Sequence, residues 1–120
     1  MKKLFFILFL FTVSATNAQN GNDNRAYSLK EVDEAPAPEG MTFDAYFRKN
    51  FKLSEKITDP IQLSFVVEKG GVIRDIKVFK DAGHGSGKEA IRVMKASPKW
   101  KPGKKDGKIV RVLYTATIKI

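Results

Sequence analysis

The stretch Ser97-Pro98-Lys99-Trp100-Lys101-Pro102-Gly103 decides how the second half of the chain folds, and it contains the only tryptophan. Proline cannot donate a backbone hydrogen bond and disfavours helix in the residue before it, so a preceding helix must end near Ser97. Trp100 combines a large apolar body with one N–H donor, which favours a buried anchor over the alternative of a ligand-stacking tryptophan. The sequence therefore predicts an extended connector with the structural motif Pro98, Trp100, Pro102 and Gly103.

Two helices are predicted from apolar residues at helical spacing. Phe43, Phe47 and Phe51 recur every four residues, which is typical of one buried helix face. Residues 89–96, just before the connector, place four apolar side chains on one face and charged side chains on the other. A phenylalanine stripe at this spacing indicates a core-facing helix rather than a ligand site.

Three strands are predicted from alternation of apolar and polar residues. Residues 61–67 alternate in this way, Lys69-Gly70-Gly71 has the composition of a tight turn, and residues 72–80 continue as the second strand of a hairpin. Residues 109–120 form the last strand, either central or at an exposed edge. The predicted order is therefore α-β-β-α-β, an α+β two-layer sandwich with a three-stranded antiparallel sheet and two helices on one face.

The N-terminus has the pattern of a secretory signal peptide. Two lysines precede an apolar run from Leu4 to Val13, and small or polar residues follow up to Ala18. The run is shorter than the roughly 20 residues that a membrane-spanning helix needs. We therefore expect cleavage after Ala18 and export of the mature chain; an uncleaved inner-membrane anchor is the alternative.

The rest of the chain divides into two parts. Residues 19–40 begin with a polar, asparagine-rich stretch and end with a short proline-containing stretch, which together predict a flexible leader and linker. Between these stretches, residues 27–32 could form a short strand or lie loosely on the domain. Residues 41–120 contain all the long apolar patterns and are predicted to form one domain. The chain has no cysteine, so packing alone must stabilise this domain.

Composition limits the choice of partner. The formal net charge of the 120-residue chain is +9, which favours an anionic membrane, an acidic protein or nucleic acid. For an exported protein nucleic acid is the least expected of these, and we predict none. A positive surface favours the approach of acidic peptides.

No residue pattern supports enzymatic chemistry. His84 is the only histidine, whereas a metal site needs about three or four ligands. The glycine-rich loop at residues 81–87 resembles a phosphate-binding loop, but Ala82 and Glu89 stand where that loop needs glycine and a serine or threonine. The sequence therefore predicts a non-enzymatic protein with no catalytic residue, no metal and no cofactor, and His84 is expected to be a solvated loop residue.

Taken together, these motifs resemble the C-terminal domain of TonB, the energy transducer of Gram-negative envelopes. The similarity spans about residues 32–120, and its first helix and preceding segment are similar to the form found in Bacteroidota. The connector with its tryptophan is the most specific of the matching motifs. They are the hairpin at residues 61–81, residues 89–94, the connector at 97–103, Gly107-Lys108 and residues 110–115.

The resemblance implies a function in TonB-dependent transport across the envelope. Members of the family bind the Ton box, a short N-terminal peptide of outer-membrane receptors, as an added strand beside the last strand of the domain. A periplasmic location and receptor N-terminal segments as partners are therefore expected. The residues of this chain that would present the backbone groups are Arg111, Val112, Leu113, Tyr114, Thr115, Ala116 and Thr117.

Three departures from the transducer pattern alter this expectation. Cleavage of the signal peptide would leave no membrane anchor, and only Pro36 and Pro38 stand where a long proline-rich spacer is usual. Leu53-Ser54 replaces the Tyr-Pro pair that often follows the first helix. We therefore expect a module that binds without transmitting force. The alternative is a stand-alone envelope protein that uses this fold for homodimerisation through the last strand, or for another partner, without a role in energy transduction.

Overall fold

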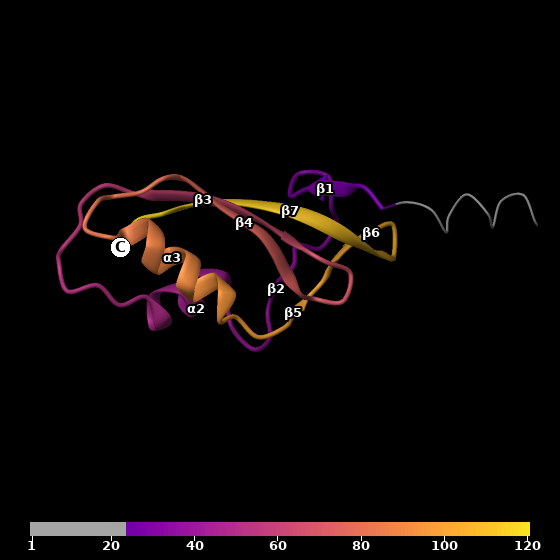
Figure 1. Cartoon of the computed structure of the whole chain (residues 1–120). Helices are drawn as coiled ribbons and strands as arrows, with labels where there is room; N and C mark the ends of the chain where they lie inside the picture. Colours follow the sequence, from indigo (N-terminus) through magenta and orange to yellow (C-terminus); the bar gives the residue numbers. More distant parts are fainter. Residues whose placement is uncertain (1–23) are drawn as a thin grey trace, which may run out of the picture.

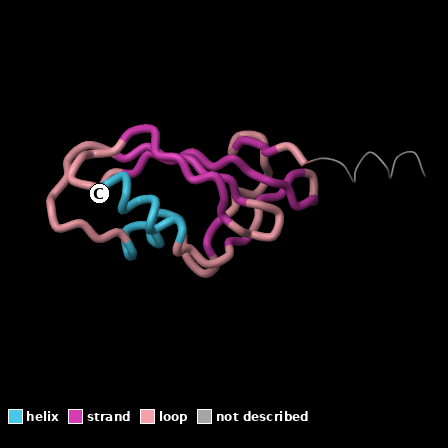
Figure 2. The backbone as a smooth tube through the Cα atoms, in the orientation of Figure 1, coloured by secondary structure: helices cyan, strands magenta, loops and turns pink. Residues whose placement is uncertain are grey.

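The computed structural model describes residues 24–120, and the predicted signal peptide lies outside them. Two helices cover one face of a twisted sheet, which gives the molecule two layers (Figures 1 and 2). The elements in chain order are β1 (Ala26–Ser28), β2 (Ala37–Pro38), α2 (Phe43–Asn50), β3 (Ile61–Val67), β4 (Ile73–Lys80), α3 (Ser86–Lys95), β5 (Trp100–Lys101), β6 (Gly103–Lys105) and β7 (Lys108–Ile118). The α+β class and the two helices on one face are as predicted.

The sheet itself differs from the prediction of three antiparallel strands. Its order is β1-β7-β3-β4, with β6 paired to a different part of β7. The β3–β4 and β3–β7 pairs are antiparallel as expected, but β1 lies parallel to β7. The sequence left residues 27–32 open between a short strand and a loosely lying segment, because so few residues show no clear alternating pattern; the structure has β1 at residues 26–28.

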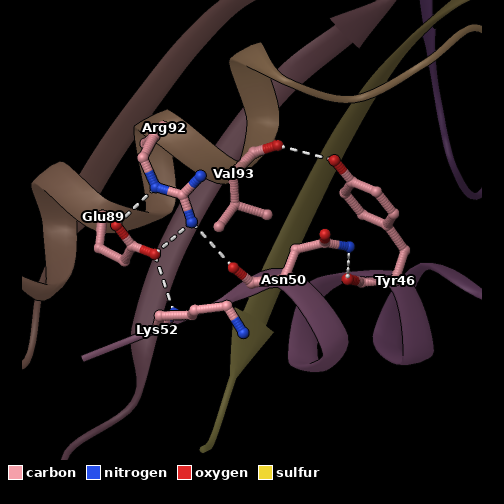
Figure 3. Close-up of polar contacts among 6 residues, drawn as sticks. All are labelled: Tyr46, Asn50, Lys52, Glu89, Arg92 and Val93. Atoms are coloured by element: carbon pink, nitrogen blue, oxygen red, sulfur yellow. Dashed lines mark hydrogen bonds and ion pairs between the residues drawn. The ribbon is translucent and has the colours of Figure 1, made fainter. Parts of the chain in front are cut away.

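The two helices are fastened to each other by a chain of polar contacts at the end of α2 (Figure 3). The hydroxyl of Tyr46 donates to the carbonyl of Val93 over 2.9 Å, and Arg92 donates to the carbonyl of Asn50 over 2.9 Å. The Glu89 carboxylate accepts hydrogen bonds from Arg92 and from the backbone N–H of Lys52. Glu89, which argued against a phosphate-binding loop, therefore helps to join the two helices, and the hydrogen bonds from Arg92 lower its pKa.

Trp100 lies at the centre of the main core, between the helices and the sheet. Only 2% of its surface is exposed, and its ring centroid lies 5.5 Å from that of Phe43, 5.3 Å from Phe65 and 5.6 Å from Tyr114. Its indole N–H donates to the hydroxyl of Ser97 over 2.8 Å. The predicted buried anchor is confirmed, and at this burial its ring presents no face on which a ligand could stack.

The connector that contains Trp100 lies against the turn between β3 and β4. The backbone N–H of Trp100 donates to the carbonyl of Gly71 over 2.9 Å. Gly71 has a φ of +89°, and a Cβ at this position would overlap the carbonyl oxygen of Trp100. Only glycine fits here, because both the backbone conformation and the close approach exclude a side chain.

Candidate partner-binding edge

Strand β7 carries all seven residues predicted to contact a partner, and its two sides differ. On one side β3 pairs with it continuously, from Val112 to Ile118. On the other side β1 pairs with Arg111, Val112 and Leu113. Within residues 24–120 no strand pairs with residues 114–118 on this second side. We call residues 114–118 the open half of β7, and residues 111–113, which pair with β1, the covered half.

The structure therefore divides the predicted edge between two environments. Tyr114, Thr115, Ala116 and Thr117 lie in the open half, while the other three predicted residues are paired with β1. Successive backbone groups of a strand point to alternate sides, so about half of those in the open half point away from β3. These groups are the ones that an added strand could pair with.

The open half rests on the main core. Tyr114 is half-buried and its ring stacks on Phe65, with centroids 5.0 Å apart and an interplanar angle of 11°. Burial raises the pKa of the Tyr114 hydroxyl above its ordinary value. Thr115 and Thr117 are exposed on the opposite face of the sheet. The aromatic packing beneath Tyr114 holds this part of the edge in a fixed conformation.

The covered half is held by an ion pair. The guanidinium of Arg111 donates to both carboxylate oxygens of Glu68, over 2.8 and 3.2 Å, and to the backbone carbonyl of Asn24 over 2.7 Å. The hydrogen bonds from Arg111 lower the pKa of Glu68. A single side chain of β7 thus connects the end of β3 to the segment that leads into β1.

A small second cluster of apolar side chains lies between β1 and β7. Tyr27 is 7% exposed and packs with Val110 and Val112. The guanidinium of Arg25 lies 3.9 Å from the centroid of the Tyr27 ring. The strand ends at Ser28, and the Glu31 carboxylate accepts a hydrogen bond from the N–H of Ser28 over 2.8 Å.

The segment that follows β1 also lies against the domain. The backbone of Glu34 exchanges hydrogen bonds with that of Lys104, and β2 pairs with β5 through Ala37–Lys101 and Pro38–Trp100. The sequence predicts a flexible leader and linker over residues 19–40; in the structure residues 24–38 make these ordered contacts. Polar and proline-rich composition missed them because the partners lie about 60 to 85 residues further along the chain.

A pocket of about 420 Å³ opens beyond the end of β7. It is lined by Phe51 and residues 53–57, which follow α2, and by Ile120. Four of its lining residues are apolar or aromatic, and in the described part of the chain no group of three or more histidine, cysteine, aspartate or glutamate side chains could hold a metal. His84 is exposed, as expected, with its Nδ1 atom 4.0 Å from the Glu55 carboxylate.

No helix in residues 24–120 has the length and apolar character needed to cross a bilayer. The fold and the edge together define a small two-layer α+β domain with a partly open sheet. The chain belongs to the family described as Gram-negative bacterial TonB protein C-terminal, whose model matches residues 53–119, more than half of the chain. The matched range contains β3, β4, α3 and β5 to β7, whereas β1, β2 and α2 precede it.

Domains of this family are non-enzymatic protein-interaction domains of the cell envelope, and they interact with outer-membrane receptors. This places the chain among TonB-related proteins of envelope transport. Neither the curated proteins nor the solved structures compared with the chain gave a match.

Proposed function

We propose that this chain is a non-enzymatic periplasmic module that binds the N-terminal Ton-box segments of outer-membrane receptors by β-strand addition, in TonB-dependent transport. The observation that carries this proposal is the open half of β7, residues 114–118, which no strand of the described chain covers on the side away from β3. In strand addition the main-chain hydrogen bonds provide affinity, and side-chain pockets select the partner.

The surroundings of the open half suit a peptide partner. Thr115 and Thr117 expose small, β-branched side chains that favour an extended neighbour. Without Lys2 and Lys3 the mature chain keeps 20 basic and 13 acidic residues, a net charge of +7 that favours the approach of segments that carry acidic residues. The core beneath Tyr114 fixes the edge before binding, which reduces the conformational entropy lost when a peptide is ordered on it.

Binding without force transmission is part of the proposal. The two prolines that could begin a spacer lie against the domain instead: Pro36 is buried, and Pro38 pairs with Trp100. A segment held in this way does not serve as an extended tether between membranes. Export after cleavage behind Ala18 completes the proposal, and N-terminal sequencing of the secreted form would test that cleavage.

A peptide titration tests the binding mode. The ¹⁵N-labelled mature chain would be titrated with synthetic peptides that copy receptor N-terminal segments. We expect the largest amide shifts at residues 114–118, and a control peptide with alternate backbone amides methylated should bind far more weakly, because it keeps the side chains but loses main-chain donors. The absence of any shift in β7 at millimolar peptide would refute strand addition.

Homodimerisation through β7 would use the same edge and is separated by sedimentation. A monomer at micromolar concentration is expected. A tight dimer whose amides at residues 114–118 are protected would replace the receptor proposal, because the edge would already be filled. In cells, a photo-crosslinker at Thr115 should capture an outer-membrane receptor rather than a second copy of the chain.

A further inference from the structure

Strand β1 occupies the part of β7 that continues from the open half. Its residues Ala26, Tyr27 and Ser28 pair with Arg111, Val112 and Leu113. The covered and open positions therefore lie on the same side of the same strand, end to end. A partner strand longer than about five residues, added at residues 114–118, would meet β1 before its pairing was complete.

The attachment of β1 is small compared with that of the other strands. It has three residues, of which only Tyr27 is buried, while Ala26 and Ser28 are exposed. Strand β3, by contrast, pairs along seven residues with β7 and has five consecutive buried residues. Strand β1 also lies outside the residues matched by the family model.

Resting on the proposed function, we infer that β1 is an internal occupant of the binding edge, and that a partner strand displaces it to extend its pairing from the open half onto residues 111–113. Displacement would lengthen the pairing from five positions of β7 to eight. In the free chain β1 would be docked on β7 in most molecules. The measured affinity for a partner would then equal the affinity of the form with β1 detached, multiplied by the fraction of molecules in that form.

The site that β1 leaves specifies what the partner should provide. The place of Tyr27 is an apolar position over Val110 and Val112, which suits a bulky apolar side chain. The Arg111 guanidinium, which bonds to the Asn24 carbonyl while β1 is docked, would be able to donate to a carbonyl of the incoming strand. The inferred partner is therefore an extended peptide of about eight residues with a large apolar residue near one end.

A reversible crosslink tests displacement directly. The chain has no cysteine, so Ser28→Cys with Leu113→Cys introduces one possible disulfide between two exposed, paired residues. Neighbouring strands lie about 4.8 Å apart, which falls in the range of Cα separations that a disulfide spans. Oxidised and reduced forms of this one protein are matched, because any effect of the two substitutions themselves is common to both.

We expect the oxidised form to bind the receptor peptide at least about tenfold more weakly than the reduced form, because β1 can no longer leave. Tyr27→Ala in the otherwise native chain should tighten binding by about threefold to tenfold, because it weakens the docked form of β1. Equal affinity in both redox states, or weaker binding by Tyr27→Ala, would overturn the inference.

The two proposals fail in distinguishable ways. If the native chain, the reduced variant and Tyr27→Ala all leave the β7 amides unshifted, strand addition itself is refuted. If the native chain binds and the oxidised variant binds as well as the reduced one, strand addition stands and displacement of β1 is refuted. If the reduced variant alone fails to bind, the two cysteines have themselves disturbed the edge, and Tyr27→Ala decides the question. Tighter binding by Tyr27→Ala than by the native chain then supports displacement, and weaker binding refutes it.

Discussion

The two halves of β7 belong to one continuous strand but are supported differently. The open half lies over the main aromatic core, where Tyr114 contacts Phe43, Phe65 and Trp100. The covered half lies over a small cluster built around Tyr27 and is closed by a strand of three residues. The main aromatic core thus supports the part of the edge that is free, whereas the covered half is closed by a short strand with a single buried side chain. Rigidity where a partner first pairs, and a detachable element beside it, would suit stepwise binding.

The largest effect should come from removing the anchor of the open half. Trp100→Ala leaves a cavity among three aromatic rings and is expected to lower the free energy of unfolding by about 3–5 kcal/mol. This is a large share of the roughly 5–15 kcal/mol typical of a small domain. Urea denaturation followed by circular dichroism would measure it.

Tyr27→Ala is the matched substitution in the covered half. We expect a smaller loss of about 1–2 kcal/mol, because a three-residue strand can detach locally without unfolding the domain. Equal losses for the two substitutions would mean that the two halves are supported equally, and the contrast between them would be lost.

The glycine turn beneath Trp100 gives the next largest effect. Gly71→Ala combines a positive φ with overlap of the Trp100 carbonyl, and we expect a loss of about 2–4 kcal/mol. Gly83→Ala is the control, because Gly83 has a similar φ of +81° but no atom within 4 Å of a Cβ. Its cost should be limited to about 1 kcal/mol of backbone strain. If both variants lose the same stability, the close approach to Trp100 is not what restricts this turn.

Hydrogen exchange compares the two halves without any substitution. Amides of residues 114–118 that point away from β3 should exchange at least about tenfold faster than those of residues 111–113 that point toward β1, a difference of about 1.4 kcal/mol. Amides of β3, which is paired on both sides, should be the slowest. Protection of the open half that disappears on dilution would instead reveal a second copy of the chain on the edge.

The smallest effect concerns the ion pair of the covered half. Arg111 lowers the pKa of Glu68 below its ordinary value of 4.5, so the pair stabilises the fold above that pH, and this stabilisation is lost as the pH falls through the folded-state pKa. Glu68→Gln should lower the free energy of unfolding by about 0.5–1 kcal/mol at pH 7, a small loss because the ion pair is partly solvated. The loss should become progressively smaller below about pH 4, where Glu68 of the native chain becomes protonated. Exposed Glu39→Gln is the control and should change stability by less than about 0.5 kcal/mol. A Glu68→Gln deficit that stays constant from pH 7 to pH 3 would contradict an ionic origin.

Much of the fold could be predicted because its signals are local. The prolines around Trp100, the phenylalanines of α2 and the alternation in β3 each act through neighbours within a few residues. The start of α3 was less predictable: it begins at Ser86 rather than Glu89, and the Ser86 hydroxyl accepts a hydrogen bond from the backbone N–H of Ala82 over 2.8 Å. Gly85 ends the preceding loop with a φ of +81°, which the glycine-rich composition allowed but did not locate.

The candidate edge was predicted only in part. The length and β-branched composition of residues 109–120 indicated a strand that could pair with a partner, and the resemblance to the family indicated which strand. Neither indicated that Arg111, Val112 and Leu113 would already be paired. The side chains of Ala26, Tyr27 and Ser28 carry no pattern that distinguishes a docked strand from a polar leader.

The sequence by itself determined the two helices, the hairpin, the extended connector of Trp100 and the last strand, because each follows from spacing, proline chemistry or alternation within a short window. Only the tertiary structure decided how β7 is shared between β3 and β1, and so which five of its residues remain open on one side. The physical reason is distance along the chain: residues 26–28 pair with residues 111–113, which lie 85 positions further on, so no pattern within a short window could reveal the contact.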